Sequence, residues 1–149
     1  MKAWNDDDTF SNGILFFCVN SEIYSNVIIS TTLKSEIPRL KGKLENIAVN
    51  QVIYNLPKSA AYTEMYNITF PNDFYTNNNY MFIISTQSQI DNDCLVFAVS
   101  DGNNTMILAA ELNYCKELSI HKLTNARITE TCVNNLQIKD IVRRLSEFF

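Results

Sequence analysis

The feature that most constrains the fold of this chain is a polar turn between two β-rich segments. The segments span residues 94–100 and 105–111, and the tetrapeptide Asp101-Gly102-Asn103-Asn104 lies between them. Glycine and asparagine accept the positive φ angles that tight hairpin turns require. The pattern therefore predicts an antiparallel β-hairpin in the second half of the chain.

Other segments also have strand patterns. Four of them are short, rich in β-branched or aromatic residues and bounded by polar turns: residues 14–20, 23–30, 80–85 and 126–133. The first two are joined by the polar pair Asn20-Ser21, which predicts a second hairpin, and their apolar runs indicate burial on both faces. Residues 112–124 match neither a strand nor a helix pattern clearly.

Two helices are predicted in the first half of the chain. Apolar residues recur near helical spacing in the first of them: Ile37, Leu40, Leu44 and Ile47. Ser35 is the expected N-cap, and Thr32 is the alternative. Pro38 is expected in the first turn, where a missing N–H group costs nothing. The second helix is expected over residues 57–66, and the alternative is a strand, because residues 62–70 also show strand-like alternation.

The clearest helix closes the chain. Its apolar residues form one stripe: Ile138, Ile141, Val142, Leu145 and Phe149. Asn134 or Asn135 is the expected N-cap, and Ile141 and Leu145 are expected to face a sheet. Together the elements predict an α+β fold, a largely antiparallel sheet of about five to six strands covered by two or three helices. The length of 149 residues fits one domain.

Composition restricts the class of function. The net charge of −4 argues against nucleic-acid binding, which needs a basic surface. No apolar run approaches the ~20 residues that span a bilayer, and the start of the chain lacks the apolar region of a signal peptide. We therefore expect a soluble, cytoplasmic protein without a membrane partner. Four cysteines lie in apolar or alternating stretches, which predicts reduced, buried thiols: Cys18, Cys94, Cys115 and Cys132.

The sequence lacks the usual motifs of catalysis and cofactor binding. His121 is the single histidine, and the three glycines are isolated rather than arranged in a phosphate-binding loop. The carboxylate clusters Asp6-Asp7-Asp8 and Asp91-Asn92-Asp93 lack the glycine and the distant glutamate of a calcium-binding loop. We expect no enzymatic activity, no metal and no cofactor. Carboxylates that the fold brings together would still allow catalysis on a small molecule.

Several segments along the chain share features with one known family. They are Trp4 with Phe10 and Asn12-Gly13-Ile14, then residues 32–37, 66–71, 97–102 and 112–114, and the terminal amphipathic helix. In these segments the chain resembles the small bacterial immunity proteins of contact-dependent growth inhibition and polymorphic-toxin systems. The likeness concerns strands, turns and caps, and it implies a single immunity-protein-like domain over residues 1–149. Family members often carry another strand before the tryptophan, so the first sheet edge is expected to differ.

The resemblance implies a cytoplasmic antidote that binds the toxin domain of its own system and blocks its active site or substrate path. Such toxins are frequently nucleases with basic clefts, which an acidic protein can fill. The expected partner-binding residues are therefore carboxylates outside the predicted core: Asp6, Asp7, Asp8, Asp91, Asp93, Glu111 and Glu117. Polar and aromatic residues such as Tyr75, Asn77 and Tyr80 are the alternative contacts. The alternative functions are a small-molecule enzyme and an adaptor subunit of a larger assembly.

Overall fold

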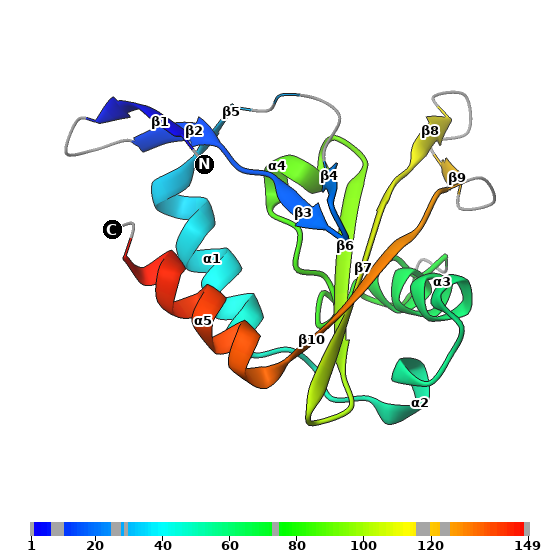
Figure 1. Cartoon of the computed structure of the whole chain (residues 1–149). Coiled ribbons are helices and arrows are strands. Elements are labelled where there is room, and N and C mark those ends of the chain that lie inside the picture. Colours follow the sequence, from blue (N-terminus) through cyan, green and yellow to red (C-terminus); the bar gives the residue numbers. More distant parts are fainter. Residues whose placement is uncertain are drawn as a thin grey trace.

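The computed structural model describes residues 2–6, 11–24, 28, 30–72, 75–115, 120–122 and 126–147. Its centre is an antiparallel sheet with the strand order β10–β7–β6 (Figure 1). β6 (Cys94–Ser100) and β7 (Asn104–Glu111) form the predicted hairpin, and β10 (Thr129–Asn134) pairs with the other edge of β7. In the turn, Gly102 has a φ of 105°, a left-handed conformation that glycine adopts without strain.

Two extended segments cover the outer edge of β6. The hydrogen bonds that attach them run from Ala98 N to Phe82 O (2.8 Å), from Ile84 N to Val96 O (2.8 Å) and from Ser100 N to Ala48 O (3.0 Å). The strand predicted over residues 80–85 is present only as a bridge between Ile83 and Phe97, because a turn occupies its beginning. On this side, β6 therefore forms hydrogen bonds with segments that are not regular strands.

α2 (Gln51–Tyr54) and α3 (Lys58–Thr69) lie on one side of the central sheet (Figure 1). α3 is the helix predicted over residues 57–66. Its side chains Tyr62 and Met65 are fully buried and share a core cluster with Phe97 of β6. Burying large apolar side chains stabilises a fold by about 1.5–3 kcal/mol each, so this cluster fixes α3 to the sheet.

α1 (Leu33–Glu45) and α5 (Asn135–Ser146) lie side by side on the opposite side (Figure 1). Leu40 and Leu44 of α1 share a second core cluster with Ala98 of β6. Successive residues of a strand point to opposite faces, so Phe97 and Ala98 serve different clusters. The apolar run of β6 is explained by this burial on both faces.

The start of α1 differs from the prediction. Ser35 was the expected N-cap, but Thr32, the predicted alternative, occupies the N-cap position. Pro38 consequently lies inside the helix, in the second turn rather than the first. The helix begins earlier because Leu33 is already a core residue, with 2% of its surface exposed. Burial of that side chain favours helical geometry from residue 33 onward.

α5 confirms the predicted C-terminal helix and its N-cap. Asn134 Oδ1 accepts a hydrogen bond from Gln137 N at 2.9 Å, and Gln137 Oε1 accepts one from Asn134 N at 2.8 Å. This reciprocal capping box satisfies two backbone donors. Ile138 is buried and Leu145 half-buried, whereas Ile141 is 39% exposed. Ile141 and Leu145 line a cavity together with Ile107 of β7 and Val133 of β10, so both lie on the side of α5 that was predicted to face a sheet, although Ile141 is not buried there.

The N-terminal strands form two small sheets of their own. One sheet contains β1 (Lys2–Asp6), β2 (Ser11–Ile14) and β5 (Ser30–Thr32), and the other contains β3 (Phe17–Val19) and β4 (Glu22–Tyr24). Asn20 and Ser21 have φ angles of 48° and 66°, so the predicted hairpin turn is confirmed. The strand predicted over residues 14–20 is divided between β2 and β3. Of the strand predicted over residues 23–30, the first two residues belong to β4 and the last to β5, and residues 25–27 and 29 lie outside the described residues. Val19 and Tyr24 are buried in the core of the central sheet. The α+β class is confirmed, with the antiparallel strands shared among small sheets.

Three short elements complete the described chain. They are α4 (Gln87–Ile90), β8 (Asn113–Cys115) and β9 (Ile120–Lys122). β8 and β9 pair antiparallel, so the described part of the segment 112–124 is mostly extended, and residues 116–119 and 123–124 lie outside it. His121 lies in β9, and its side chain is outside the described residues. Among the described helices, none combines the length and apolarity needed to cross a membrane.

The cysteine side chains are only partly buried. Cys18, Cys94 and Cys132 are free thiols, and the side chain of Cys115 lies outside the described part. Cys94 is fully buried, but Cys18 and Cys132 are exposed, so the predicted burial is wrong for these two. Cys18 lies opposite the exposed Ile23 on the outer face of the β3–β4 hairpin, and Cys132 lies on the edge strand of the central sheet.

Candidate functional site

Three of the predicted carboxylates gather at the open end of the β6–β7 hairpin. Glu111 is the register partner of Cys94, and Asp93 directly precedes Cys94. The Leu112 N–H group donates to the Asp93 carbonyl at 2.8 Å, which holds the two chain segments together. Asp91 lies in the same turn as Asp93. We call Asp91, Asp93 and Glu111 the acidic end of the hairpin.

α4 and the turn after it position the acidic end. The short helix begins with a capping box, in which Gln89 Oε1 accepts a hydrogen bond from Thr86 N at 3.0 Å. At its end, Gln87 Nε2 donates to Asp91 Oδ1 at 2.7 Å. Asp93 has a φ of 59°, in the left-handed region that aspartate and asparagine tolerate better than most residues. The turn therefore leaves Asp91 exposed and Asp93 half-buried.

The carboxylates also influence two neighbouring acids. Burial raises the pKa of Tyr66, and the charge of Asp93 raises it further. Burial raises the pKa of Cys94 to about 12, with a smaller contribution from Glu111. Both side chains are therefore neutral near pH 7. The acidic end thus offers negative charge toward a cationic partner, and neither neighbouring acid is ready to act as a base.

The other predicted contact residues are not part of this group. Asp6 is the last residue of β1 and pairs with Ser11 of β2, in a different sheet. Asp7, Asp8 and Glu117 lie outside the described residues. Within the described part of the chain, the fold therefore brings together Asp91, Asp93 and Glu111 and separates them from β1.

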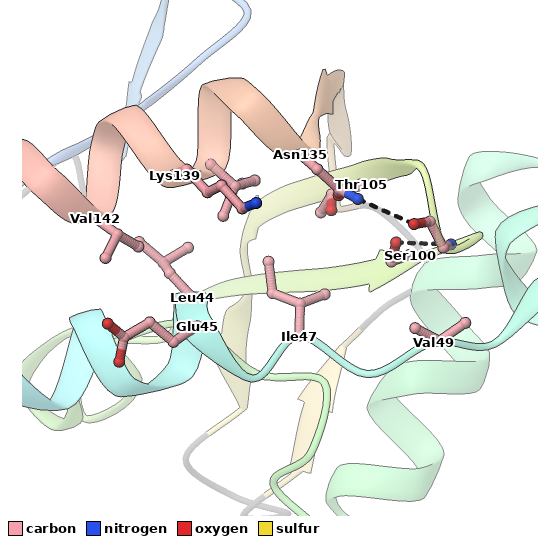
Figure 2. Close-up of a pocket in the computed structure, with 11 residues that line it drawn as sticks. Leu44, Glu45, Ile47, Val49, Ser100, Thr105, Asn135, Lys139 and Val142 are labelled. Atoms are coloured by element: carbon pink, nitrogen blue, oxygen red, sulfur yellow. Dashed lines mark hydrogen bonds between the residues drawn. The ribbon is translucent and has the colours of Figure 1, made fainter.

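A pocket of about 430 Å³ opens at the other end of the hairpin, beside the turn (Figure 2). Apolar side chains from α1, from the segment after it and from α5 line it together with polar groups of the turn: Leu44, Ile47, Val49, Ile138, Val142, Ser100, Thr105 and Asn135. Asn135 Nδ2 donates to the Gly102 carbonyl at 3.0 Å, which ties α5 to the turn. The walls come from distant parts of the chain, so sequence reasoning did not anticipate this pocket.

The pocket lacks a recognisable catalytic arrangement among its described lining residues. The Ser100 hydroxyl donates to the Asn104 carbonyl at 2.8 Å and accepts from the Gly102 N–H at 3.0 Å, so it stabilises the turn. Lys139 and Glu45 are the charged residues in the lining. Because neither is hydrogen-bonded to Ser100, the site has no activated nucleophile of the usual kind.

A second cavity, of about 480 Å³, lies between β3, α1, α5 and β10. Its lining is mostly apolar and includes Phe16, Phe17, Leu40, Ile141 and Leu145. Among the described residues that line it, the polar ones are uncharged: Cys18, Asn20 and Thr131. In the part of the chain that the structure describes, no group of three or more His, Cys, Asp or Glu side chains could hold a metal ion.

Comparison with known proteins connects this architecture to one family. The family model described as "Immunity protein 42" matches residues 1–148. Among curated proteins, none matches this chain. Among solved structures, the crystal structure of CdiI from Burkholderia dolosa AUO158 has the same fold, with a TM-score of 0.71 and 16% sequence identity. The alignment covers 96% of this chain and 87% of that one. The resemblance noted in the sequence is thereby confirmed.

Proposed function

Because this chain belongs to the immunity protein 42 family, we propose that it is an immunity protein that binds and neutralises the toxin domain of its own system. The observation that carries this proposal is the family match over residues 1–148. Such a role requires a complementary surface and no chemistry of its own. The protein therefore works as a stoichiometric inhibitor rather than as an enzyme.

The toxin in this proposal is a nuclease, and the inhibitor blocks its active site or the path of its substrate. A nuclease must bind the phosphate backbone, so its cleft carries positive charge. This chain has a net charge of −4, and the acidic end of the hairpin is negative, so both are complementary to such a cleft. Complementary charge accelerates encounter and disfavours wrong partners. Asp91, the exposed member of the acidic end, is the most accessible to such a partner.

The remaining predicted carboxylates belong to the same proposal. Asp6, Asp7, Asp8 and Glu117 add negative charge to the toxin-binding surface. The site of action is the cytoplasm, where the toxin would otherwise damage the cell. The free thiols of Cys18, Cys94 and Cys132 support this compartment, because it keeps thiols reduced.

The test is reconstitution with the toxin domain encoded by the neighbouring gene. The purified immunity protein and that domain should form a 1:1 complex in size-exclusion chromatography. An equimolar amount of the immunity protein should abolish cleavage of nucleic acid by the toxin domain. A toxin domain from an unrelated system serves as the control and should neither bind nor be inhibited. Full toxin activity in the presence of excess immunity protein would contradict the proposal.

A further inference from the structure

One exposed stretch of the chain has the composition of a protein-binding surface. Every residue from 75 to 81 is exposed, and we call this stretch the tyrosine loop. Tyr75 is 99% exposed, Tyr80 52% and Met81 50%. A tyrosine or tryptophan buries roughly 150–250 Å² when it is covered, and tyrosine is among the residues that dominate binding energy. Three large exposed side chains in this short stretch of chain offer a surface that a partner can cover.

The C-terminal part of the tyrosine loop is held in place by contacts within the protein. Asn78 Nδ2 donates to Tyr80 Oη at 2.9 Å, and Asn79 Oδ1 accepts from Met81 N at 3.2 Å. The Tyr80 ring also meets the Phe70 ring edge-on, with 6.2 Å between the centroids. A side chain that is already positioned loses less conformational entropy when it binds. The Tyr80 side chain is therefore already positioned for binding in the free protein.

A row of aromatic rings runs from the tyrosine loop to Tyr66 in α3. Tyr80 contacts Phe70, and the Phe70 ring lies 5.3 Å from the ring of Tyr66. Burial raises the pKa of Tyr66, and the charge of Asp93 raises the pKa further. The tyrosine loop itself carries no charged residue. Exposed tyrosine rings on a protein with a net charge of −4 suit an arginine, whose flat guanidinium group stacks on aromatic rings and whose charge is complementary.

Two other exposed apolar side chains fit the centre of a binding surface less well. Val49 and Leu136 are 65% and 75% exposed near the pocket beside the turn. Valine and leucine are under-represented among residues that dominate binding energy, and no aromatic residue lines that pocket. The tyrosine loop is therefore the stronger candidate for the centre of an interface.

We infer that the tyrosine loop forms the centre of the toxin-binding surface and receives an arginine-bearing segment of the toxin domain, with Tyr80 as its anchor. This inference rests on the proposed function. The acidic end steers the partner during association, whereas the tyrosine loop determines how long the complex lasts.

The test compares variants of Tyr80 in binding to the toxin domain encoded by the neighbouring gene. Tyr80→Leu should weaken binding by about 30-fold or more, mainly through faster dissociation, as expected for a residue that dominates the interface. Tyr80→Phe keeps the aromatic ring and should stay within about threefold of the wild type. Because Tyr80 contacts Phe70, the more exposed Tyr75→Ala provides a second variant with little risk to folding, and it should weaken binding by about tenfold.

Two matched controls are Val52→Ala and Leu136→Ala, at side chains that are 76% and 75% exposed outside the tyrosine loop. Both should change affinity by no more than about twofold, as most surface substitutions do. If the wild-type protein does not bind the toxin domain at all, the proposed function fails. If the wild type binds and Tyr80→Leu and Tyr75→Ala bind equally tightly, the tyrosine loop is not the interface. An equal loss in Tyr80→Phe and Tyr80→Leu would overturn the arginine-stacking role.

Discussion

The ring of Tyr62 in α3 meets the ring of Phe97 in β6 edge-on, with 5.1 Å between the centroids and an interplanar angle of 83°. Both rings are fully buried. Edge-to-face contact places the positive edge of one ring against the negative face of the other. One helical turn after Tyr62, Tyr66 leads to the aromatic row of the tyrosine loop. The packing of α3 on β6 therefore supports the proposed binding surface.

Removal of the Tyr62 ring should destabilise the protein strongly. We expect Tyr62→Ala to lower the free energy of unfolding by about 3–5 kcal/mol, because it leaves a large cavity at a fully buried position. Tyr62→Phe keeps the ring contact and should cost about 1 kcal/mol or less, since the hydroxyl makes only a long 3.5 Å hydrogen bond to the Leu95 carbonyl. Denaturant titration of the two variants measures the difference. Similar losses in both would show that the hydroxyl, and not the ring contact, stabilises α3.

α5 offers a test of which stripe residues contribute to stability. Ile138→Ala should cost about 2–5 kcal/mol because Ile138 is buried in the core cluster between α1, α5 and the sheet. Ile141→Ala should cost clearly less, because that side chain is 39% exposed. Leu136→Ala, at a position 75% exposed, is the control and should stay within about 0.5 kcal/mol. Equal losses for Ile138→Ala and Ile141→Ala, measured by thermal or denaturant unfolding, would contradict the observed packing.

Local chemistry made some of these elements predictable and left others out of reach. The turn at Gly102 and the cap at Asn134 depend on residues within three positions, so the sequence contains all the required information. The choice between Thr32 and Ser35 as the N-cap, and with it the position of Pro38, depends on the burial of Leu33 in tertiary packing, so the local sequence left both caps open. Pairing between Glu111 and Cys94 joins residues that are separated by the whole hairpin. The predicted hairpin had residues 94 and 111 at its open end, and the strand register shows that Glu111 lies opposite Cys94, next to Asp93.

The thiols should differ sharply in reactivity. Cys18 and Cys132 are exposed and should react with a small alkylating reagent in the folded protein within minutes to hours. Cys94 is fully buried and its pKa is raised to about 12, so it should react only after denaturation. Peptide mass spectrometry after labelling with and without denaturant distinguishes each site. Rapid labelling of Cys94 in the folded protein would show that β6 is not buried as described.

Alkaline pH should lower the free energy of unfolding, because the pKa of Cys94 is raised in the folded protein. Its pKa is raised from 9.0 to about 12 in the folded protein, so between these values the folded state holds a proton that the unfolded state has lost. Stability from this group is complete below pH 9 and is lost as the pH rises toward 12, by up to about 1.4 kcal/mol per pH unit. Cys94→Ala should flatten this slope when unfolding is measured from pH 8 to about pH 11. Cys132→Ala is the matched control, and an unchanged slope in Cys94→Ala would contradict the assignment.

The acidic end should control how fast the toxin domain is captured. In the variant Asp91→Asn, Asp93→Asn, Glu111→Gln, we expect association to slow by about tenfold at low salt and its salt dependence to flatten, because steering by opposite charge is lost. Asparagine is the suitable replacement at residue 93, since it also tolerates the left-handed backbone with φ of 59°. Dissociation should change little, because each exposed charge pair contributes under ~1 kcal/mol.

A second triple variant separates the position of the charges from their number. Glu45→Gln, Glu64→Gln and Glu130→Gln remove the same three charges from α1, α3 and β10 and leave the acidic end intact. Stopped-flow or biosensor kinetics at two salt concentrations should show near wild-type association for this control. Equal slowing in both variants would mean that only net charge matters. Unchanged association in both would mean that carboxylates do not steer the partner, and the tyrosine loop would then have to recognise the toxin domain without help from charge.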